Sequence, residues 1–331
     1  MKKRIVCLGG GTGTSVVLSG LKKYPVELSA IVSMADSGGS NRVIRDEFGL
    51  LPTSDIRQCF VALAQDQNNL EHSLRELFAY RFPLGKGFKG MTFGNLFMAA
   101  LTDIFGSQVA AIKKTGQILR IKGKVLPATL TNSNLVAIYE NGKKVVGESK
   151  IDETKRGGKV KIKKVYLKPE PRAYPEAVEA ILKADLVVIG PGDLYTSLVV
   201  NLTIPGIVKV LRKTKAKIAY VLNLMTKFGQ TYGFNAKEHV SVMEKYLGKG
   251  CLDFVLVNSR TLPKPALKKY KKAEELPVVD NLEDSYFKVV RGDFLSLKET
   301  KKVPGDVLKR SLIRHDSDKL AKVLIKLCRP R

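Results

Sequence analysis

Four glycines and three hydroxyl side chains stand together near the start of the chain. Glycine has no Cβ, so an anion can come close to its backbone, and glycine also allows positive φ angles. The hydroxyls would add donors at the start of a helix, where free N–H groups and the helix dipole favour a phosphate. We interpret the stretch as a phosphate loop, with a tight turn that binds no ligand as the alternative. Its residues are Gly9, Gly10, Gly11, Thr12, Gly13, Thr14 and Ser15.

This stretch differs from three familiar phosphate loops. A dinucleotide fingerprint needs G-x-G-x-x-G, but counting from Gly9 puts Thr14 at the last position. A Walker A loop needs a lysine that the stretch lacks. The string also resembles the signature of tubulin-like GTPases, in which the loop lies well inside the domain, whereas here it ends the first expected strand. The sequence therefore predicts a phosphate near a first strand-to-helix turn and leaves the ligand open.

An acidic residue, Asp36, follows the second expected strand at residues 27–32. Doubly wound folds often contact a ribose or a metal with an acidic residue at this place. We expect the residues after Asp36 to form a second flexible, hydroxyl-rich loop facing the first, although an Asx-type turn is the alternative. The loop runs from Ser37 to Asn41, and its candidate contact residues are Ser37, Gly38, Gly39 and Ser40.

Two further helix starts carry candidate ligand contacts. Asp55 opens an expected helix that continues to residue 64, and an acidic residue there is also what the helix dipole favours. A cation one turn inside is unfavourable, so we expect Arg57 to face a ligand. Gly94 and Asn95 stand at the start of an expected helix over 93–101, where they donate to a ligand or form a cap.

The later half of the chain repeats the opening pattern. A buried strand expected at 185–189 leads into a glycine turn with hydroxyls, which we interpret as a second phosphate or substrate loop. The next two strands, 217–222 and 254–258, end close to asparagines at the edge where open α/β sheets bind ligands. Arg314 is a plausible clamp for a diphosphate, and His315 beside it is structural. The candidate residues are Gly190, Pro191, Gly192, Asp193, Tyr195, Thr196, Ser197, Asn223, Thr226 and Asn258.

The alternation of strands and helices predicts an α/β fold for the chain as a single domain, residues 1–331. Residues 122–166 are an expected basic antiparallel β insertion, with short strands at 126–130, 135–139 and 144–148 and a hairpin signal at Asn141-Gly142. Residues 260–310 are an expected basic peripheral segment.

Composition narrows the class of partner. Lys and Arg number 57 against 31 acidic residues, a formal charge of +26, which favours an anionic partner such as nucleic acid or a phosphorylated metabolite. The excess is spread along the chain without a nucleic-acid-binding motif, so we interpret it as solvated surface with weak nonspecific affinity for nucleic acid. The four Cys and three His are dispersed, which disfavours zinc and disulfides. No run reaches the ~18 apolar residues of a membrane span, so we expect a cytoplasmic protein.

These strings together resemble the YvcK/CofD family, which contains the gluconeogenesis factor YvcK and the 2-phospho-L-lactate transferase CofD. The resemblance to the YvcK branch spans nearly the whole chain and implies a Rossmann-like three-layer αβα core, with a mostly parallel sheet and ligands at the strand C-termini. It implies a UDP-sugar-binding protein linked to carbon metabolism and cell shape, or a magnesium-dependent transfer of a phospholactyl group to a deazaflavin. The matching stretches are 9–15, 35–40, 55–57, 93–96, 190–197, 223–226 and 314–316.

The chain departs from the family pattern at several positions. Ser37 replaces a second Asp and Arg42 a Gly, so one carboxylate suited to a metal is lost. Thr53-Ser54 replaces Pro-Gly, and Met91 replaces a His that could act as an acid or base. The basic insertions around Lys155 and Lys268 are not expected from the family.

Three hypotheses follow, in this order. In the first, a nucleotide-sugar-binding regulator holds phosphates at 9–13 and 190–197, a ribose or base-side group at Asp36, and the diphosphate at Arg314. In the second, a CofD-like transferase holds Mg²⁺ at Asp36 and Asp55, because phosphoryl transfer can work mainly by positioning and electrostatics. In the third, the protein binds nucleic acid nonspecifically through its excess of Lys and Arg. Whether there is turnover, and whether the chain forms a homo-oligomer, are left open.

Overall fold

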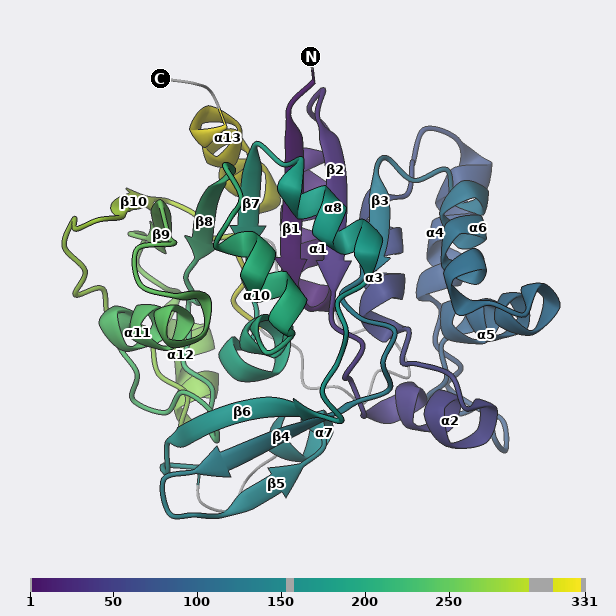
Figure 1. Ribbon diagram of the computed structural model, residues 1–331, viewed down its shortest axis with the longest axis horizontal. Helices are drawn as coiled ribbons and strands as arrows, with labels where there is room; N and C mark the ends of the chain where they lie inside the picture. Colours follow the sequence, from purple (N-terminus) through teal and green to yellow (C-terminus); the bar gives the residue numbers. More distant parts are fainter. Residues whose placement is uncertain (1, 153–157, 298–311, 329–331) are drawn as a thin grey trace.

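The computed structural model describes residues 2–152, 158–297 and 312–328, which are built around one seven-stranded sheet (Figure 1). Every neighbouring pair in this sheet is parallel, in the order β10-β9-β8-β7-β1-β2-β3. The carboxyl ends of all seven strands therefore lie along one edge. The strands are β1 (Arg4–Gly9), β2 (Glu27–Val32), β3 (Lys124–Pro127), β7 (Leu186–Ile189), β8 (Lys217–Val221), β9 (Phe254–Asn258) and β10 (Lys288–Gly292).

Helices cover both faces of the sheet, so alternate residues of one strand enter two different cores. Val6 and Leu8 of β1 pack in the first core with the helices α8 (Pro175–Leu182), α10 (Pro205–Leu211) and α11 (Ala236–Leu247). Ile5 and Cys7 pack in the second core with α1 (Gly11–Leu21), α3 (Ser54–Leu63) and α13 (Ser317–Leu327). Burial on both faces explains why the strands are nearly continuous apolar runs. The four cysteines are free.

The remaining helices lie around this three-layer core. Figure 1 shows α4, α5 and α6 gathered beyond β3, with α2 below them. After β7, a short π-helical segment, η1, continues directly into α9. These elements are α2 (Gly39–Phe48), α4 (Asn69–Ala79), α5 (Phe93–Phe105), α6 (Gln108–Ile118), η1 (Leu194–Val199), α9 (Val200–Leu202) and α12 (Lys264–Lys271).

A small antiparallel sheet in the order β5-β4-β6 lies beyond the carboxyl ends of the main strands (Figure 1). It consists of β4 (Asn134–Tyr139), β5 (Lys144–Val146) and β6 (Ile162–Lys168), and α7 (Glu148–Asp152) follows β5. The predicted hairpin joins β4 to β5, with Gly142 at φ +81°. The insertion thus covers the edge of the main sheet where ligands are expected.

The α/β fold, the parallel sheet and the antiparallel insertion confirm the predictions from sequence, while three local assignments were wrong. The expected strand at 126–130 overlaps β3, which pairs with β2 in the main sheet instead of joining the insertion. Glu148, expected at the end of a strand, begins α7. Gly39 and Ser40, expected in a loop, open α2. A run of four or five apolar residues has too little period to distinguish an edge strand from an insertion strand.

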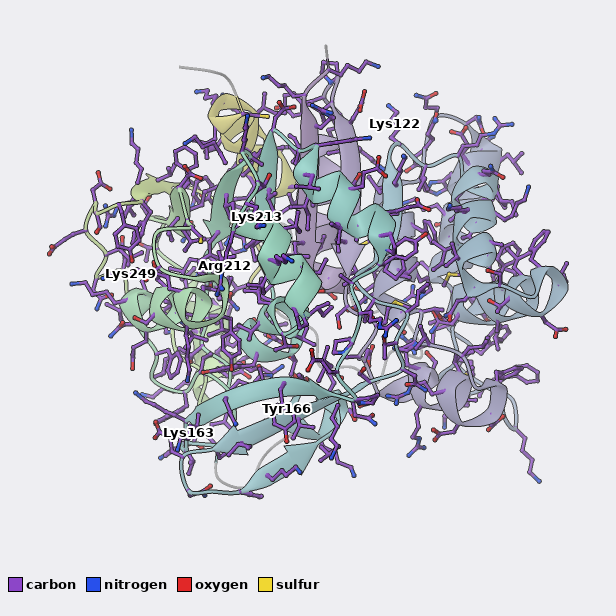
Figure 2. The ribbon with its side chains drawn as sticks, in the orientation of Figure 1. Lys122, Lys163, Tyr166, Arg212, Lys213 and Lys249 are labelled. Carbon is purple, nitrogen blue, oxygen red and sulfur yellow. The ribbon has the colours of Figure 1, made fainter. Side chains whose placement is uncertain are left out.

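Two sequence expectations fall partly outside the described residues, namely the basic region around Lys155 and residues 298–310 of the expected basic segment. Elsewhere the positive charge is dispersed, as Figure 2 shows for Lys122, Lys163, Arg212 and Lys249 on different elements. No single helix in the described ranges is long and apolar enough to cross a membrane; one bent pair, Leu194–Leu202 with Pro205–Leu211, meets the length and composition test together.

Candidate functional site

The two glycine loops pack directly against each other at the carboxyl edge of the sheet. β1 ends at Gly9, Gly10 is the N-cap, and α1 begins at Gly11. A Cβ added to Gly13 would lie 1.8 Å from the carbonyl oxygen of Pro191, and one added to Gly10 would lie 2.8 Å from Oγ of Ser197. None of these four glycines has a positive φ. Gly10 and Gly13 are needed here for the close approach of the second loop rather than for an unusual dihedral angle.

Asp55 of α3 occupies the start of α1, where the sequence predicted a phosphate. Its carboxylate accepts a hydrogen bond from the backbone N–H of Gly11. Gln58, one turn further along α3, accepts from Oγ1 of Thr12 at 2.6 Å. The positive end of the α1 dipole therefore already faces a carboxylate of the protein itself.

Asp36, after β2, is fixed by the Asx-type turn that the sequence offered as an alternative to a flexible loop. Its Oδ1 accepts from the backbone N–H of Gly38 at 2.8 Å, and its Oδ2 accepts from Nδ2 of Asn41. Oδ1 of Asn41 in turn accepts from the backbone N–H groups of Thr53 and Ser54, at 3.1 and 3.2 Å. A single amide side chain thus joins the Asp36 turn to the beginning of α3.

Asn95 connects a third helix, α5, to this hydrogen-bond network. It is fully buried in the first turn of α5, and its Nδ2 donates to Oγ of Ser40 at 2.9 Å and to Oγ of Ser54 at 3.0 Å. Gly94 next to it allows Arg57 to pack closely, because a Cβ there would lie 2.8 Å from Cδ of Arg57. Asn95 and Gly94 therefore hold α5 against α2 and α3.

Three carboxyl groups interact electrostatically at this edge: Asp36, Asp55 and Glu148. Burial, followed by the charge of Asp36, raises the pKa of Asp55 to about 7, against the opposing effects of the Gly11 N–H and Arg57. Burial and then Asp36 raise the pKa of Glu148 well above its usual value. Burial also raises the pKa of Asp36, against the opposing effects of the Gly38 N–H, Glu148 and Asn41. Burial and mutual repulsion therefore favour the protonated form of all three carboxyl groups.

A second charged group lies beside the first and is also supplied in part by the insertion. Nζ of Lys227 is 3.1 Å from Oδ1 of Asp152 on α7 and 3.4 Å from Oδ2 of Asp193 in the second glycine loop. Burial and Asp193 raise the pKa of Asp152 to about 6, while Lys227 opposes the rise. Burial lowers the pKa of Lys227, but the two carboxylates more than offset this, so its pKa is raised. Lys227 therefore remains charged and links the insertion to the loop.

Some predicted residues make internal contacts that pack the site. Asn223 donates to the carbonyl of Gly192 at 2.8 Å, and Thr196 accepts from Nε2 of Gln230 at 3.3 Å. Thr14 is fully buried, and Ser15 donates to the carbonyl of Thr12 at 2.8 Å. These bonds hold the loops in place, and a ligand contact for these side chains stays a prediction.

Three other predicted residues form hydrogen bonds with partners outside the glycine loops. Asn258 donates to the carbonyl of Arg260 and accepts from the N–H of Phe294, at the end of β9. Thr226 bonds Leu276 through both its backbone and its hydroxyl. The hydroxyl of Tyr195 reaches the carbonyl of Ile162 under the insertion. These partners describe structural roles, and ligand binding by these residues remains untested.

Arg57, predicted to face a ligand, and Arg314, predicted to clamp a diphosphate, differ in their setting. Arg57 is buried in α3, with only 8% of its surface exposed. Arg314 is half-buried and precedes His315, which forms an isolated bridge with Leu295. His315 is buried, and burial lowers its pKa to about 4, so it is neutral at physiological pH. The backbone of Arg314 accepts a hydrogen bond from the N–H of Ser296, just after β10, and its role as a diphosphate clamp stays a prediction.

Sequence reasoning missed the site residues that come from the insertion and from helix interiors. Glu148 and Asp152 are four residues apart on α7, a spacing that places them on one helix face, but the segment was read as a strand. Asn41 fell at the edge of the expected loop, and Gln58 lay three residues after Asp55 on a helix already predicted. Lys227 directly follows Thr226 and carries no local signal of its partners.

The carboxylates do not form a protein-only metal cage. Within residues 2–152, 158–297 and 312–328, no group of three or more His, Cys, Asp or Glu side chains is arranged to hold a metal ion. Mg²⁺ commonly binds through one or two carboxylates together with water and ligand phosphates. The electrostatically coupled pair Asp36 and Asp55 fits that mode, because burial and mutual repulsion give the pair a reason to take up a cation.

A wholly parallel sheet covered by helices on both faces, with polar loops at the carboxyl ends of its strands, defines an open α/β fold of the kind that binds ligands at that edge. The chain belongs to the CofD family, since the family profile described as 2-phospho-L-lactate transferase CofD matches residues 5–295. It is 38% identical to the gluconeogenesis factor of Bacillus subtilis over 98% of both chains, and 40% identical to that of Halalkalibacterium halodurans over 84% of both.

A solved structure confirms the fold. The crystal structure of a member of the UPF0052 family from Bacillus halodurans matches with a TM-score of 0.87 at 34% identity, covering 98% of this chain and 99% of that one. The resemblance noted from the sequence strings is therefore confirmed along nearly the whole chain.

Proposed function

We propose that the chain is a cytoplasmic regulatory protein of the gluconeogenesis-factor type, linked to gluconeogenic carbon metabolism and cell shape, that binds a UDP-sugar. The observation that carries the proposal is the contact between the two glycine loops at the start of α1, with Gly10 against Ser197 and Gly13 against Pro191. The identity to gluconeogenesis factors across the whole chain supports the same assignment.

The chemistry of a nucleoside diphosphate suits this edge when a cation accompanies it. The start of η1 faces the edge and offers backbone N–H groups that favour phosphate, whereas the Gly11 N–H at the start of α1 is already bonded to Asp55. The carboxylates of Asp36 and Asp55 would repel a bare diphosphate. A bound Mg²⁺ would be held by Asp36 and Asp55, and it would supply positive charge to the phosphates. Arg314 would supply a further cation for the phosphates, whereas Lys227 is already paired with Asp152 and Asp193.

Thermal denaturation with and without Mg²⁺ tests this function, using UDP-sugars, UDP, UMP and NAD as probes. We expect a UDP-sugar to raise the melting temperature more in the presence of Mg²⁺, since a ligand that binds only the folded state stabilises it. The Asp36→Asn variant should lose the Mg²⁺-dependent part of the shift. The absence of a shift with every UDP-sugar, in a protein that unfolds cooperatively, contradicts the proposal.

A second candidate function, transfer of a phospholactyl-type group, is favoured by one observation. Asp55 has a pKa of about 7 and lies at the start of α1, so it could exchange a proton near neutral pH. The family profile that matches the chain is described by that transferase activity. Incubation with a phospholactyl donor, a deazaflavin acceptor and Mg²⁺ tests it. Product that forms with wild type and not with Asp55→Asn supports transfer, whereas UDP-sugar binding without product supports the regulator.

A further inference from the structure

The helix α5 presents an apolar side to solvent at the margin of the molecule (Figure 1). Phe93, Phe97, Ala100 and Ile104 follow one another at intervals of four, three and four residues, so they share one side of the helix. Ala100 is exposed and Ile104 is 70% exposed, while Phe93 and Phe97 are half-buried. The opposite side of the helix is buried through Asn95, Met98, Ala99 and Thr102.

A helix that is apolar on both sides is normally covered on both sides. α5 has 13 residues, of which Asp103 alone is charged. A helix needs ~20 residues to cross a membrane, so α5 is too short to be covered by spanning one. Its exposed side is therefore suited to contact with another protein surface.

The two phenylalanines of this side are held in place by the preceding helix, α4. The centres of their rings lie 6.3 Å (Phe93) and 5.1 Å (Phe97) from that of Phe78, both in edge-to-face geometry. A Cβ at Gly94 would lie 2.8 Å from the backbone oxygen of Phe78, so the start of α5 is pressed against the end of α4. The surface is therefore preformed, and a contact on it would order few further side chains.

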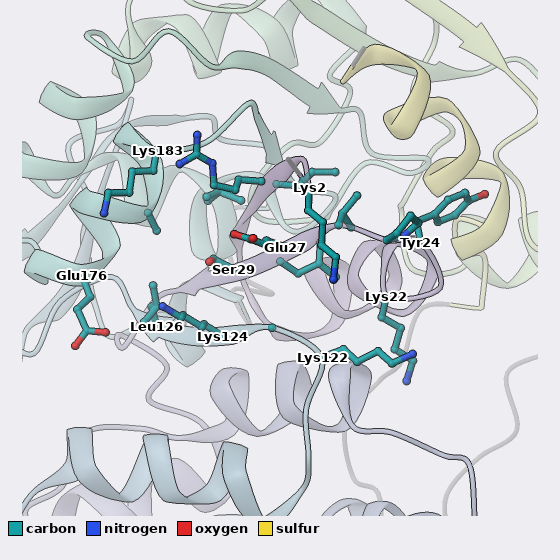
Figure 3. Close-up of a pocket in the computed structure, with 18 of the residues that line it drawn as sticks. Lys2, Lys22, Tyr24, Glu27, Ser29, Lys122, Lys124, Leu126, Glu176 and Lys183 are labelled. Atoms are coloured by element: carbon teal, nitrogen blue, oxygen red, sulfur yellow. The ribbon is translucent and has the colours of Figure 1, made fainter. Parts of the chain in front are cut away.

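The distribution of charge favours a second copy of the chain as the partner. Each copy carries a formal charge of +26, so two copies repel each other over most of their surfaces. The amino edge of the main sheet is an example, since Lys22 and Lys122 lie beside one face of it and Lys124 beside the other (Figure 3). Residues 90–112, which include α5, contain no Lys or Arg. Two copies can therefore approach along α5 without bringing cations of this segment together.

The order of side chains along α5 is also self-complementary. Ala100 is the smallest of the four and stands between the bulky Phe97 and Ile104. A two-fold axis through the middle of the helix would make the two copies of α5 antiparallel and place Phe97 of each copy opposite Ile104 of the other. The small central residue allows the helix axes to approach to about 8–10 Å. The antiparallel arrangement also places opposite ends of the two helix dipoles side by side.

We propose that the exposed side of α5 is the contact between two copies of this chain, related by a two-fold axis near Ala100. A stable contact buries about 800 Å² on each partner, which is more than one side of a helix of this length offers. We expect the adjoining end of α4 to take part, where Tyr80 is 46% exposed and its carbonyl accepts from the N–H of Phe93 at 3.0 Å. The proposal does not depend on the function assigned to the carboxyl edge.

Sedimentation velocity at about 150 mM salt, over a range of protein concentrations and without ligand, tests the proposal. We expect a species of twice the chain mass of 36.5 kDa that dissociates on dilution. Ile104→Glu should raise the dissociation constant of this dimer at least tenfold, because it would place a charge against Phe97 of the other copy. Ile104 is mostly exposed in the single chain, so the variant should keep the circular dichroism spectrum and cooperative unfolding of wild type.

Leu182→Glu is the matched control, because Leu182 is 55% exposed on a different helix, α8, and its replacement should leave the dimer intact. Ala100→Arg, which would bring two cations together near the two-fold axis, should dissociate the dimer as Ile104→Glu does. A wild-type protein of 36.5 kDa at every concentration overturns the proposal, as does equal dissociation by Leu182→Glu or none by the two α5 variants. If wild type is monomeric and sediments with phosphatidylglycerol vesicles while Ile104→Glu does not, the surface binds lipid and the assignment to a second copy is wrong.

Discussion

The carboxylate of Asp55 accepts a hydrogen bond from the backbone N–H of Gly11 at the first residue of α1. This bond and the helix dipole favour the charged carboxylate, whereas burial and the nearby charge of Asp36 oppose it. Burial and the charge of Asp36 have the larger effect, because the pKa of Asp55 is raised to about 7. The protein thus keeps an anionic side chain at a position suited to a ligand phosphate, poised between its two protonation states at neutral pH.

Replacement of Asp55 by Asn should stabilise the protein at alkaline pH. An acid whose pKa is raised on folding binds its proton more tightly in the folded state, so wild type loses stability as pH rises from about 4 through 7. Asn keeps an oxygen to accept from Gly11 but carries no charge. We expect Asp55→Asn to gain on the order of 2 kcal/mol in unfolding free energy at pH 8 and little at pH 4. Urea denaturation at both pH values measures it, and a gain that does not grow with pH contradicts the assigned pKa.

Gly13→Ala should be far more damaging than alanine at another glycine that lacks a positive φ. The added Cβ would lie 1.8 Å from the backbone oxygen of Pro191, and backbone cannot move aside as a flexible side chain can. We expect a loss of about 3 kcal/mol or more in unfolding free energy. Gly38→Ala is the control, because its Cβ would lie 3.4 Å from the nearest atom. Equal stability of the two variants would show that the glycine loops do not pack as described.

Lys227→Met should destabilise the protein in a pH-dependent way. The lysine offsets Asp152 and Asp193, and without it the two carboxylates, each about one-third exposed, remain beside each other. The pKa of Asp152, already raised to about 6, should then rise further, so the loss relative to wild type appears as pH increases above 6. We expect a loss of roughly 1–2 kcal/mol at pH 8 and a smaller one at pH 5, because water screens a partly exposed pair. Adding Asp152→Asn should restore part of the stability, and no rescue would indicate that Lys227 acts through other contacts.

Asn41→Ala should loosen the connection between the Asp36 turn and α3. The change removes the acceptor for the N–H groups of Thr53 and Ser54 and the donor to Asp36. We expect a loss of about 2–3 kcal/mol in unfolding free energy, together with a further rise in the pKa of Asp36. Gln117→Ala, exposed on α6, is the control and should change stability by less than ~0.5 kcal/mol. Urea denaturation distinguishes the two, and equal effects would count against the network.

The sequence allowed the parallel sheet and the position of its polar edge to be predicted. Strand-sized apolar runs ending in Gly or Asn are local patterns, and parallel strands place their carboxyl ends together whatever the rest of the chain does. The first glycine stretch was correctly placed between a strand and a helix for the same reason. Its glycines, however, serve contact with Pro191 and Ser197, nearly two hundred residues away. A local sequence pattern cannot predict a contact between residues that lie so far apart along the chain.

What the sequence by itself determined was therefore the order of elements and the residues at the end of each strand, because hydrophobic period and turn chemistry act over a few residues. Only the tertiary structure decided that Asp55 lies against Gly11 and that Lys227 joins Asp152 to Asp193. Charges interact through space, so their partners and their pKa values depend on where folding brings them and not on their separation along the chain.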